Sequence, residues 1–83
     1  MAKTFFPLAQ KTVYVDASAP HPPNTQYKIS IGHETWGNDN HEVVKVQMVY
    51  DGAVSGRRSP SYPLGTDDYQ RVTNKLQELI ASR

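Results

Sequence analysis

The sequence predicts an α+β fold: a four-stranded antiparallel β-meander with one C-terminal α-helix packed on one face. Two patterns lead to this prediction. Between residues 11 and 64, apolar and polar residues alternate in short stretches, as they do in half-buried strands. Over residues 66–82, apolar residues recur at helical spacing instead. The chain has 83 residues, which is enough for a single domain spanning residues 1–83 and no more.

The last stretch, residues 66–82, is predicted to be the helix. Thr66 is expected at its N-cap, because the hydroxyl can accept a hydrogen bond from a free amide of the first turn. Asp67 and Asp68 would then lie at the positive end of the helix dipole. A helix of this length is marginal alone in water and needs a surface to cover. Its apolar stripe consists of Tyr69, Val72, Leu76, Leu79 and Ile80.

Four strands are predicted upstream of the helix. The first three alternate clearly, and the third is the strongest of them. The fourth is irregular, and its Pro60 and Pro63 cannot donate to a ladder, which indicates an edge position. The predicted strands span residues 11–18, 25–33, 42–50 and 53–64.

The connections between these strands favour a simple meander. Residues 1–10 have no clear period and are expected to form an N-terminal arm. Residues 19–24 hold three prolines and form a stiff connector. Residues 34–41 are a cluster of turn-forming residues, and Asp51-Gly52 is a strong signal for a two-residue hairpin turn. Hairpin links of this kind place consecutive strands side by side.

The strand phases divide the side chains between two faces of the predicted sheet. One face is apolar and is expected to lie under the helix. It collects Val13, Val15, Tyr27, Ile29, Ile31, Val44, Val46 and Met48. The opposite face is polar and cationic and includes an aromatic ring. It collects Tyr14, Lys28, Ser30, Lys45, Gln47 and Arg57, with Trp36 and Arg58 at the sheet margins.

The polar face has the composition of a platform for single-stranded nucleic acid. Lysine and arginine neutralise phosphates, and aromatic rings stack on unpaired bases. The same composition is typical of an ordinary solvated sheet face, so both interpretations stay open. Trp36 is the only tryptophan and lies in a polar turn, where its ring either covers the sheet edge or meets a partner. Arg57 and Arg58 are suited to binding phosphate. Alternatively, their charge keeps an exposed edge strand from pairing with another chain.

Bulk composition excludes several classes of protein. The net charge is +1, so the chain carries neither a polybasic tail nor an acidic arm. It has no cysteine, which excludes disulfides and thiolate metal sites. The N-terminal apolar stretch is too short for a signal peptide, and no stretch is long enough to span a membrane, so we expect a cytoplasmic protein. A domain this small without such cross-links is expected to gain stability as a homodimer.

The sequence offers little for catalysis. Ser59 and Ser61 have no nearby histidine to act as a base, and no glycine loop precedes a helix to hold phosphate. We therefore expect neither an enzyme nor a cofactor. Residues 33–42 contain two histidines and three carboxylates around one turn, but their spacing matches no recognised metal site, so we expect no metal either.

Residues 43–80 resemble the single-stranded DNA-binding transcriptional coactivators of the positive-cofactor-four type. The likeness is carried by an alternating strand, then glycine followed by basic residues, then leucine and an acidic helix start with an aromatic residue. In this chain these parts are residues 44–48, Gly56-Arg57-Arg58, Leu64 and Asp67-Asp68-Tyr69. The resemblance implies a homodimer paired partly through its helices, with nucleic acid on the sheet. By position it places Lys45, Arg57 and Arg58 among the binding residues.

Together these observations predict a non-catalytic protein that binds single-stranded nucleic acid and regulates transcription. The candidate binding residues are Tyr14, Lys28, Trp36, Lys45, Gln47, Arg57 and Arg58. The alternative is a small protein–protein interaction module, in which an exposed sheet edge with Phe5, Phe6 and Trp36 docks another chain.

Overall fold

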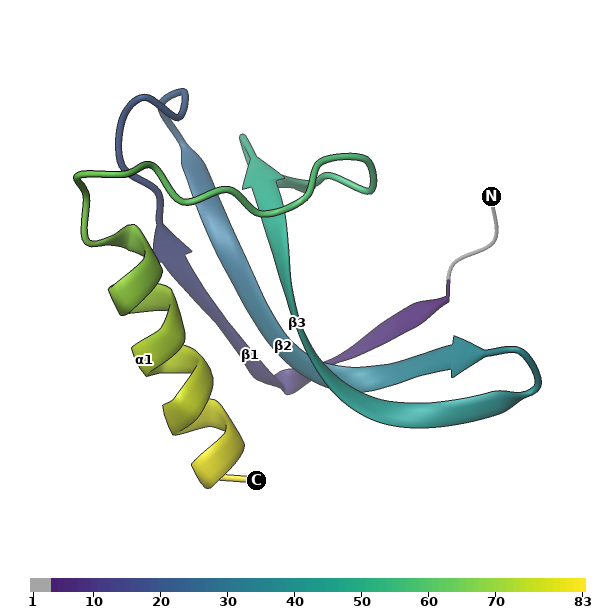
Figure 1. Ribbon diagram of the computed structural model, residues 1–83. Helices are drawn as coiled ribbons and strands as arrows, with labels where there is room; N and C mark the ends of the chain where they lie inside the picture. Colours follow the sequence, from purple (N-terminus) through teal and green to yellow (C-terminus); the bar gives the residue numbers. More distant parts are fainter. Residues whose placement is uncertain (1–3) are drawn as a thin grey trace.

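The computed structural model describes residues 4–83 and has the predicted α+β architecture (Figure 1). Its four strands follow one another in the antiparallel order β1-β2-β3-β4, and a single helix follows them. The elements are β1 (Phe5–Asp16), β2 (Thr25–Trp36), β3 (Asp39–Tyr50), β4 (Ala53–Val54) and α1 (Asp68–Ala81). Among the described residues, α1 is too short and too polar to cross a bilayer.

β1 begins at Phe5, so the prediction of an arm over residues 1–10 was wrong for its second half. Residues 1–3 lie outside the described part of the chain. The register against β2 shifts between Pro7 and Thr12, and this irregularity hides the alternation on which strand prediction depends. At Gly32 the backbones approach closely: a Cβ there would lie 2.4 Å from the carbonyl oxygen of Phe6. A glycine is therefore needed where β1 crosses β2.

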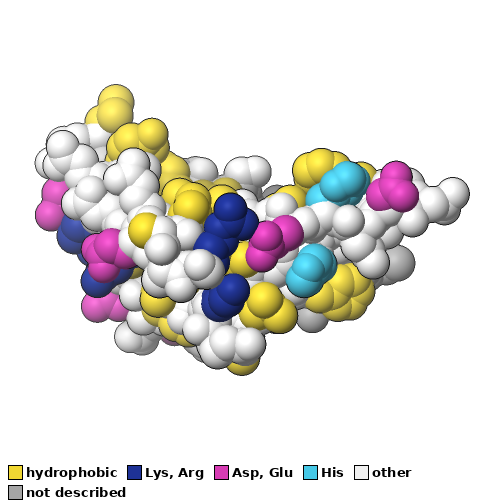
Figure 2. All heavy atoms as spheres, turned by 90° about the horizontal axis from the view of Figure 1, so that it is seen from below, with side chains coloured by type: hydrophobic (Ala, Val, Ile, Leu, Met, Phe, Trp, Pro, Cys, Tyr) yellow, Lys and Arg dark blue, Asp and Glu magenta, His cyan; other side chains and the backbone are white. Residues whose placement is uncertain are grey.

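β2 and β3 form one long hairpin that bends and projects from the body of the protein (Figures 1 and 2). Trp36 pairs with Asp39, and the register then continues without interruption to the pair Thr25 and Tyr50. Gly37 in the turn has a φ of 64°, which glycine adopts without strain. The turn predicted over residues 34–41 is thus much shorter, because the strands extend through its polar residues.

The predicted fourth strand over residues 53–64 was too long. β4 has only 2 residues, Ala53 and Val54. The segment that follows leaves the sheet edge and crosses the helix-side face, in front of β3 and β2 in Figure 1. Tyr62 from this segment stacks on Tyr27, with 5.1 Å between the ring centroids. The amides of Arg57 and Arg58 donate to the hydroxyl of Ser55, at 3.3 and 3.1 Å, so the chain turns away from β3 directly after β4.

The apolar face of the sheet is confirmed by the register. Val15 pairs with Tyr27, which pairs with Met48, and the next apolar row joins Val13, Ile29 and Val46. The buried residues of this core are Val15, Tyr27, Ile29, Ile31, Met48, Val72 and Leu79. The last two come from α1, which packs against β1 and β2.

The apolar stripe of α1 that is buried against the sheet is narrower than predicted. Val72 and Leu79 are buried, whereas Tyr69 is 60% exposed and Ile80 is 38% exposed. The helix begins at Asp68 rather than at Thr66, and Asp67 occupies the N-cap without a side-chain cap. The Thr66 hydroxyl accepts a hydrogen bond from the Asp68 amide at 3.3 Å and donates one to Pro63. It therefore stabilises the turn that enters the helix.

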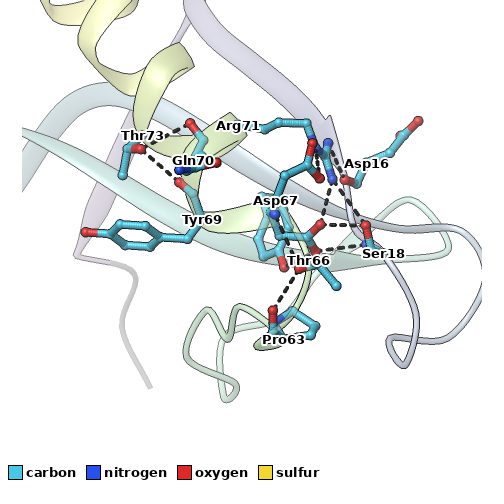
Figure 3. Close-up of polar contacts among 11 residues, drawn as sticks. Asp16, Ser18, Pro63, Thr66, Asp67, Tyr69, Gln70, Arg71 and Thr73 are labelled. Carbon is cyan, nitrogen blue, oxygen red and sulfur yellow. Dashed lines mark hydrogen bonds and ion pairs between the residues drawn. The ribbon is translucent and has the colours of Figure 1, made fainter.

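Asp68 joins the first helical turn to the loop after β1 through hydrogen bonds. Figure 3 labels two of its partners, Ser18 and Arg71. Its carboxylate is fully buried and accepts hydrogen bonds from the amide and the hydroxyl of Ser18, at 2.9 and 2.6 Å. Arg71 donates to the same carboxylate at 2.6 Å and to the carbonyl oxygen of Asp16 at 3.0 Å. These contacts fix the position of α1 on the sheet.

Candidate nucleic-acid interface

Five of the predicted binding residues lie on the sheet face opposite the helix, four of them in its middle and Trp36 near the hairpin tip. Tyr14 of β1, Lys28 of β2 and Gln47 of β3 are register partners and form one row across the sheet. Lys45 lies in the adjacent row, opposite Ser30. Partners in adjacent strands point to the same side of a sheet, so the predicted grouping of these side chains is present.

The Tyr14 end of this row is open. Tyr14 is 54% exposed. It lines a shallow hollow of about 240 Å³ with Lys28, Thr12, Pro7 and Ala9. Within residues 4–83, Lys28 has no carboxylate partner at ion-pair distance. An exposed ring beside an unpaired ammonium group suits a base together with its phosphate.

The Gln47 end of the row is less accessible than predicted. The Oε1 atom of Gln47 is buried and has no hydrogen-bond partner among the residues described. Its neighbour Val49, on the same face, is only 2% exposed. The readily accessible part of the row is therefore formed by β1 and β2.

Lys45 is engaged by an acidic residue that was expected in a turn. Its ammonium group forms an ion pair with Glu34 and lies 5.2 Å from the ring centroid of Phe5. Glu34 also accepts a hydrogen bond from Trp36 Nε1 at 2.8 Å. The hydrogen bonds from Lys45 and then Trp36 hold the pKa of Glu34 below its ordinary value. The charge of Lys45 is thus largely compensated within the protein.

Trp36 forms a second aromatic surface near the tip of the hairpin. The indole is 54% exposed and lies 4.6 Å from the imidazole of His41, with the rings tilted by 30°. Figure 2 shows histidines beside hydrophobic side chains on this projecting part, and basic next to acidic side chains nearer the centre. Alternation along β2 and β3 puts Trp36 and His41 on the same face as Lys28. In the sequence, His41 looked only like a possible metal ligand, so its ring contact with Trp36 was not expected.

The two arginines are not part of the polar face. Arg57 and Arg58 follow β4 in the segment that crosses the helix side of the sheet. The guanidinium carbon of Arg58 lies 5.8 Å from the ring centroid of Tyr50, a residue that packs against the core. Arg58 lines an open hollow of about 770 Å³ there, together with Tyr50, Tyr62 and His21. The expectation that Arg58 borders the Lys28 face was therefore wrong, because β4 ends before residue 57.

The acidic and histidine residues around the hairpin turn do not form a metal centre in the described part of the chain, since no group of three or more such side chains is placed to share an ion.

Comparison of the sequence with protein-family models and curated proteins, and of the fold with solved structures, finds no significant match. What the chain binds therefore has to be inferred from the geometry described above.

Proposed function

We propose that this protein binds single-stranded nucleic acid, without catalysis, on the sheet face opposite the helix. The observation that carries the proposal is the direct pairing of Tyr14 with Lys28 on an exposed part of that face. The Tyr14 ring offers a stacking surface to a base of any identity. The Lys28 ammonium group offers a partner to the adjoining phosphate.

The Trp36–His41 pair supplies a second stacking surface on the same face. Eight residues along β2 separate Lys28 from Trp36, which is roughly 26 Å at about 3.3 Å per residue before the bend shortens it. A strand laid along β2 could contact both surfaces. Single-strand sites in small β folds are about 4–16 nucleotides long, and a path of this length falls within that class.

The ion pair between Lys45 and Glu34 lies between the two stacking surfaces. It leaves a nearly neutral middle section, so stacking contributes more to this binding mode than charge does. The small net charge of +1 is consistent with that balance. The resemblance of residues 43–80 to the positive-cofactor-four type coactivators would place such binding in transcription regulation.

The test is a fluorescence titration of the single Trp36 with oligo-dT at two salt concentrations. We expect quenching or a spectral shift on binding, and weaker binding at the higher salt. Tyr14→Ala should weaken binding by about 1–3 kcal/mol with little change in salt slope, because a stacking surface is lost. Lys28→Gln should reduce the salt slope by about 1.

Arg58→Gln is the matched control for Lys28→Gln. Arg58 is exposed and lies on the helix side of the sheet, beside Tyr50 and away from the proposed site. This variant should bind like the wild type. The proposal fails if the wild type gives no signal with any oligonucleotide at low salt, or if Lys28→Gln and Arg58→Gln behave alike.

A protein-interaction module remains the second candidate, because β4 covers only the end of β3. An uncovered sheet edge can accept a strand from another chain. Lys28→Gln removes a phosphate contact and should lower the salt slope of nucleic-acid binding, whereas docking at the β3 edge should not respond to this substitution. The comparison of Lys28→Gln with the wild type therefore distinguishes the two candidates.

A further inference from the structure

Several backbone N–H and C=O groups on the outer edge of β3 have no partner strand among the described residues. The amide of Ser55 donates to the carbonyl oxygen of Met48 at 2.9 Å. The N–H and C=O groups of Met48 therefore point outward, away from β2. Backbone groups alternate between the two sides of a strand, so those of Glu42, Val44 and Val46 point the same way. β4 pairs only with Val49 and Tyr50. Beyond them, residues 4–83 provide no partner strand along this edge (Figure 1).

The β3 edge also lacks the backbone features that usually protect an exposed edge. Proline, bulges and very short strands are common devices, and charged side chains are another. The charged Glu42 and Lys45 of β3 are each engaged in an ion pair within the chain. The opposite edge strand, β1, has Pro7 and a register shift. β3 has neither, since its pairing with β2 runs unbroken for all 12 residues. The side chain of Val44, in the middle of the free stretch, is 36% exposed. Such an edge is a template for pairing with another strand.

We propose that the β3 edge pairs antiparallel with the β3 edge of a second copy of this chain, forming a symmetric dimer with a continuous sheet. A two-fold axis at one residue places that residue opposite the same residue of the partner subunit. Residues before it then lie opposite residues equally far after it. An axis at Lys45 or at Glu42 would oppose like charges, which is destabilising. An axis at Val44 would place Asn40 of the partner subunit opposite Met48, whose outward carbonyl oxygen is already hydrogen-bonded. An axis at Val43 opposes valine to valine and no like charges, and it pairs residues 39–47, which β4 leaves free, with the same stretch of the partner subunit.

This valine-centred register favours a second copy over an unrelated strand, because the edge is complementary to itself. With the axis at Val43, Glu42 lies opposite Val44 of the partner subunit, and Val46 lies opposite Asn40 of the partner subunit. The outward groups of these residues then become hydrogen-bonded. The pairing uses backbone groups at the edge and leaves the Tyr14–Lys28 surface uncovered. The proposal is therefore independent of the proposed nucleic-acid binding, and either can fail without the other.

Cysteine cross-linking tests the contact directly, because the natural chain has no cysteine. Directly opposed residues in antiparallel strands have Cα atoms about 4.5–5.5 Å apart, which a disulfide can bridge. In a mild redox buffer, Val43→Cys should form a disulfide dimer, and Val44→Cys should do so more slowly, because residue 44 lies off the axis. Val54→Cys is the control: Val54 is 43% exposed but lies on β4, away from the axis. Equal cross-linking of all three variants would overturn the proposal.

A charge exchange tests the same contact without covalent bonds. We expect wild-type protein to have a dimer mass by light scattering at tens of micromolar. Val43→Lys and Val43→Glu should each be monomeric, because like charges meet at the axis, and their circular dichroism spectra should match the wild type. Mixing the two variants should restore a dimer containing one of each. A wild type that stays monomeric at high concentration, or a Val43→Lys variant that still dimerises, refutes the pairing.

Discussion

The phenol of Tyr27 donates a hydrogen bond to the Asp68 carboxylate across 2.8 Å, joining the central strand to the first turn of the helix. Both side chains are fully buried. The Tyr27 hydroxyl also lies 2.9 Å from the carbonyl oxygen of Ser61, in the segment that crosses the sheet. Sheet, crossing segment and helix therefore meet at one phenol oxygen, and this junction determines how the fold responds to pH.

Asp68 should make the protein sensitive to acid. Burial opposes its ionisation, but hydrogen bonds from Ser18, Tyr27 and Arg71 outweigh burial and hold its pKa well below the ordinary value. A carboxyl group whose pKa is depressed in the folded state stabilises the fold above its unfolded pKa of about 3.9, and that contribution is lost as pH falls further. The urea midpoint should therefore decrease from pH 5 to pH 2.5.

Asp68→Asn should remove much of that acid dependence. It should also cost about 2–3 kcal/mol of unfolding free energy at pH 7, because charge-assisted hydrogen bonds are lost. Asp67→Asn is the control, since the Asp67 side chain is 65% exposed. Urea titrations of both variants at several pH values decide the point. An Asp68→Asn variant with the wild-type pH profile would contradict it.

Leu79 and Ile80 are adjacent on α1 but should differ in their effect on stability. Leu79 is 9% exposed and belongs to the core, whereas Ile80 is 38% exposed. Leu79→Ala should cost about 2–5 kcal/mol because it leaves a cavity between helix and sheet. Ile80→Ala should cost less than about 1 kcal/mol. Chemical denaturation measures both, and equal losses would show that the helix packs in a different orientation.

Gly32 should not tolerate a side chain. A Cβ at this position would lie 2.4 Å from the Phe6 carbonyl oxygen and 2.7 Å from the Cα of Pro7, both of them backbone atoms. Gly32→Ala should therefore push β1 away from β2 and cost about 1–3 kcal/mol or more. Gly56→Ala is the control, because no atom lies within 4 Å of a Cβ there. Thermal melts of both variants test the prediction, which fails if they coincide.

Glu34→Gln should strengthen the binding of single-stranded nucleic acid. The substitution removes the charge that compensates Lys45, so the ammonium group becomes available to phosphate. We expect tighter binding to oligo-dT and a salt slope larger by about 1. The double variant Glu34→Gln, Lys45→Gln should return the slope to the wild-type value. If Glu34→Gln leaves both affinity and slope unchanged, Lys45 does not face the bound strand.

The sequence predicted the two faces of the sheet because side-chain alternation is visible in three strands. Tyr14, Lys28 and Gln47 fall in one row because each strand keeps its phase over the predicted stretch. Where a strand does not keep this alternation, the sequence did not predict it. The shift between Pro7 and Thr12 concealed the first half of β1.

The candidate site was predicted less completely than the fold. Glu34 looked like a turn residue, so its ion pair with Lys45 was not expected. The position of Arg58 followed from assuming a long return strand, and no local pattern shows where such a strand stops. The stacking of His41 on Trp36 depends on strand extension through a polar stretch, where composition indicates a turn. These errors share one cause: pairing with a neighbouring strand overrides local residue preference.

The unbroken pairing of β2 with β3 also has a consequence for the order of folding. The two strands meet at a short turn around Gly37, and each successive pair closes a loop only slightly larger than the one before. Contacts between residues close in sequence cost the least chain entropy, so we expect this hairpin to form first. The link between Ser18 and Asp68 joins distant parts of the chain and has to form later. The free edge of β3 is therefore complete before the helix docks, and two nascent chains could recognise each other at that stage.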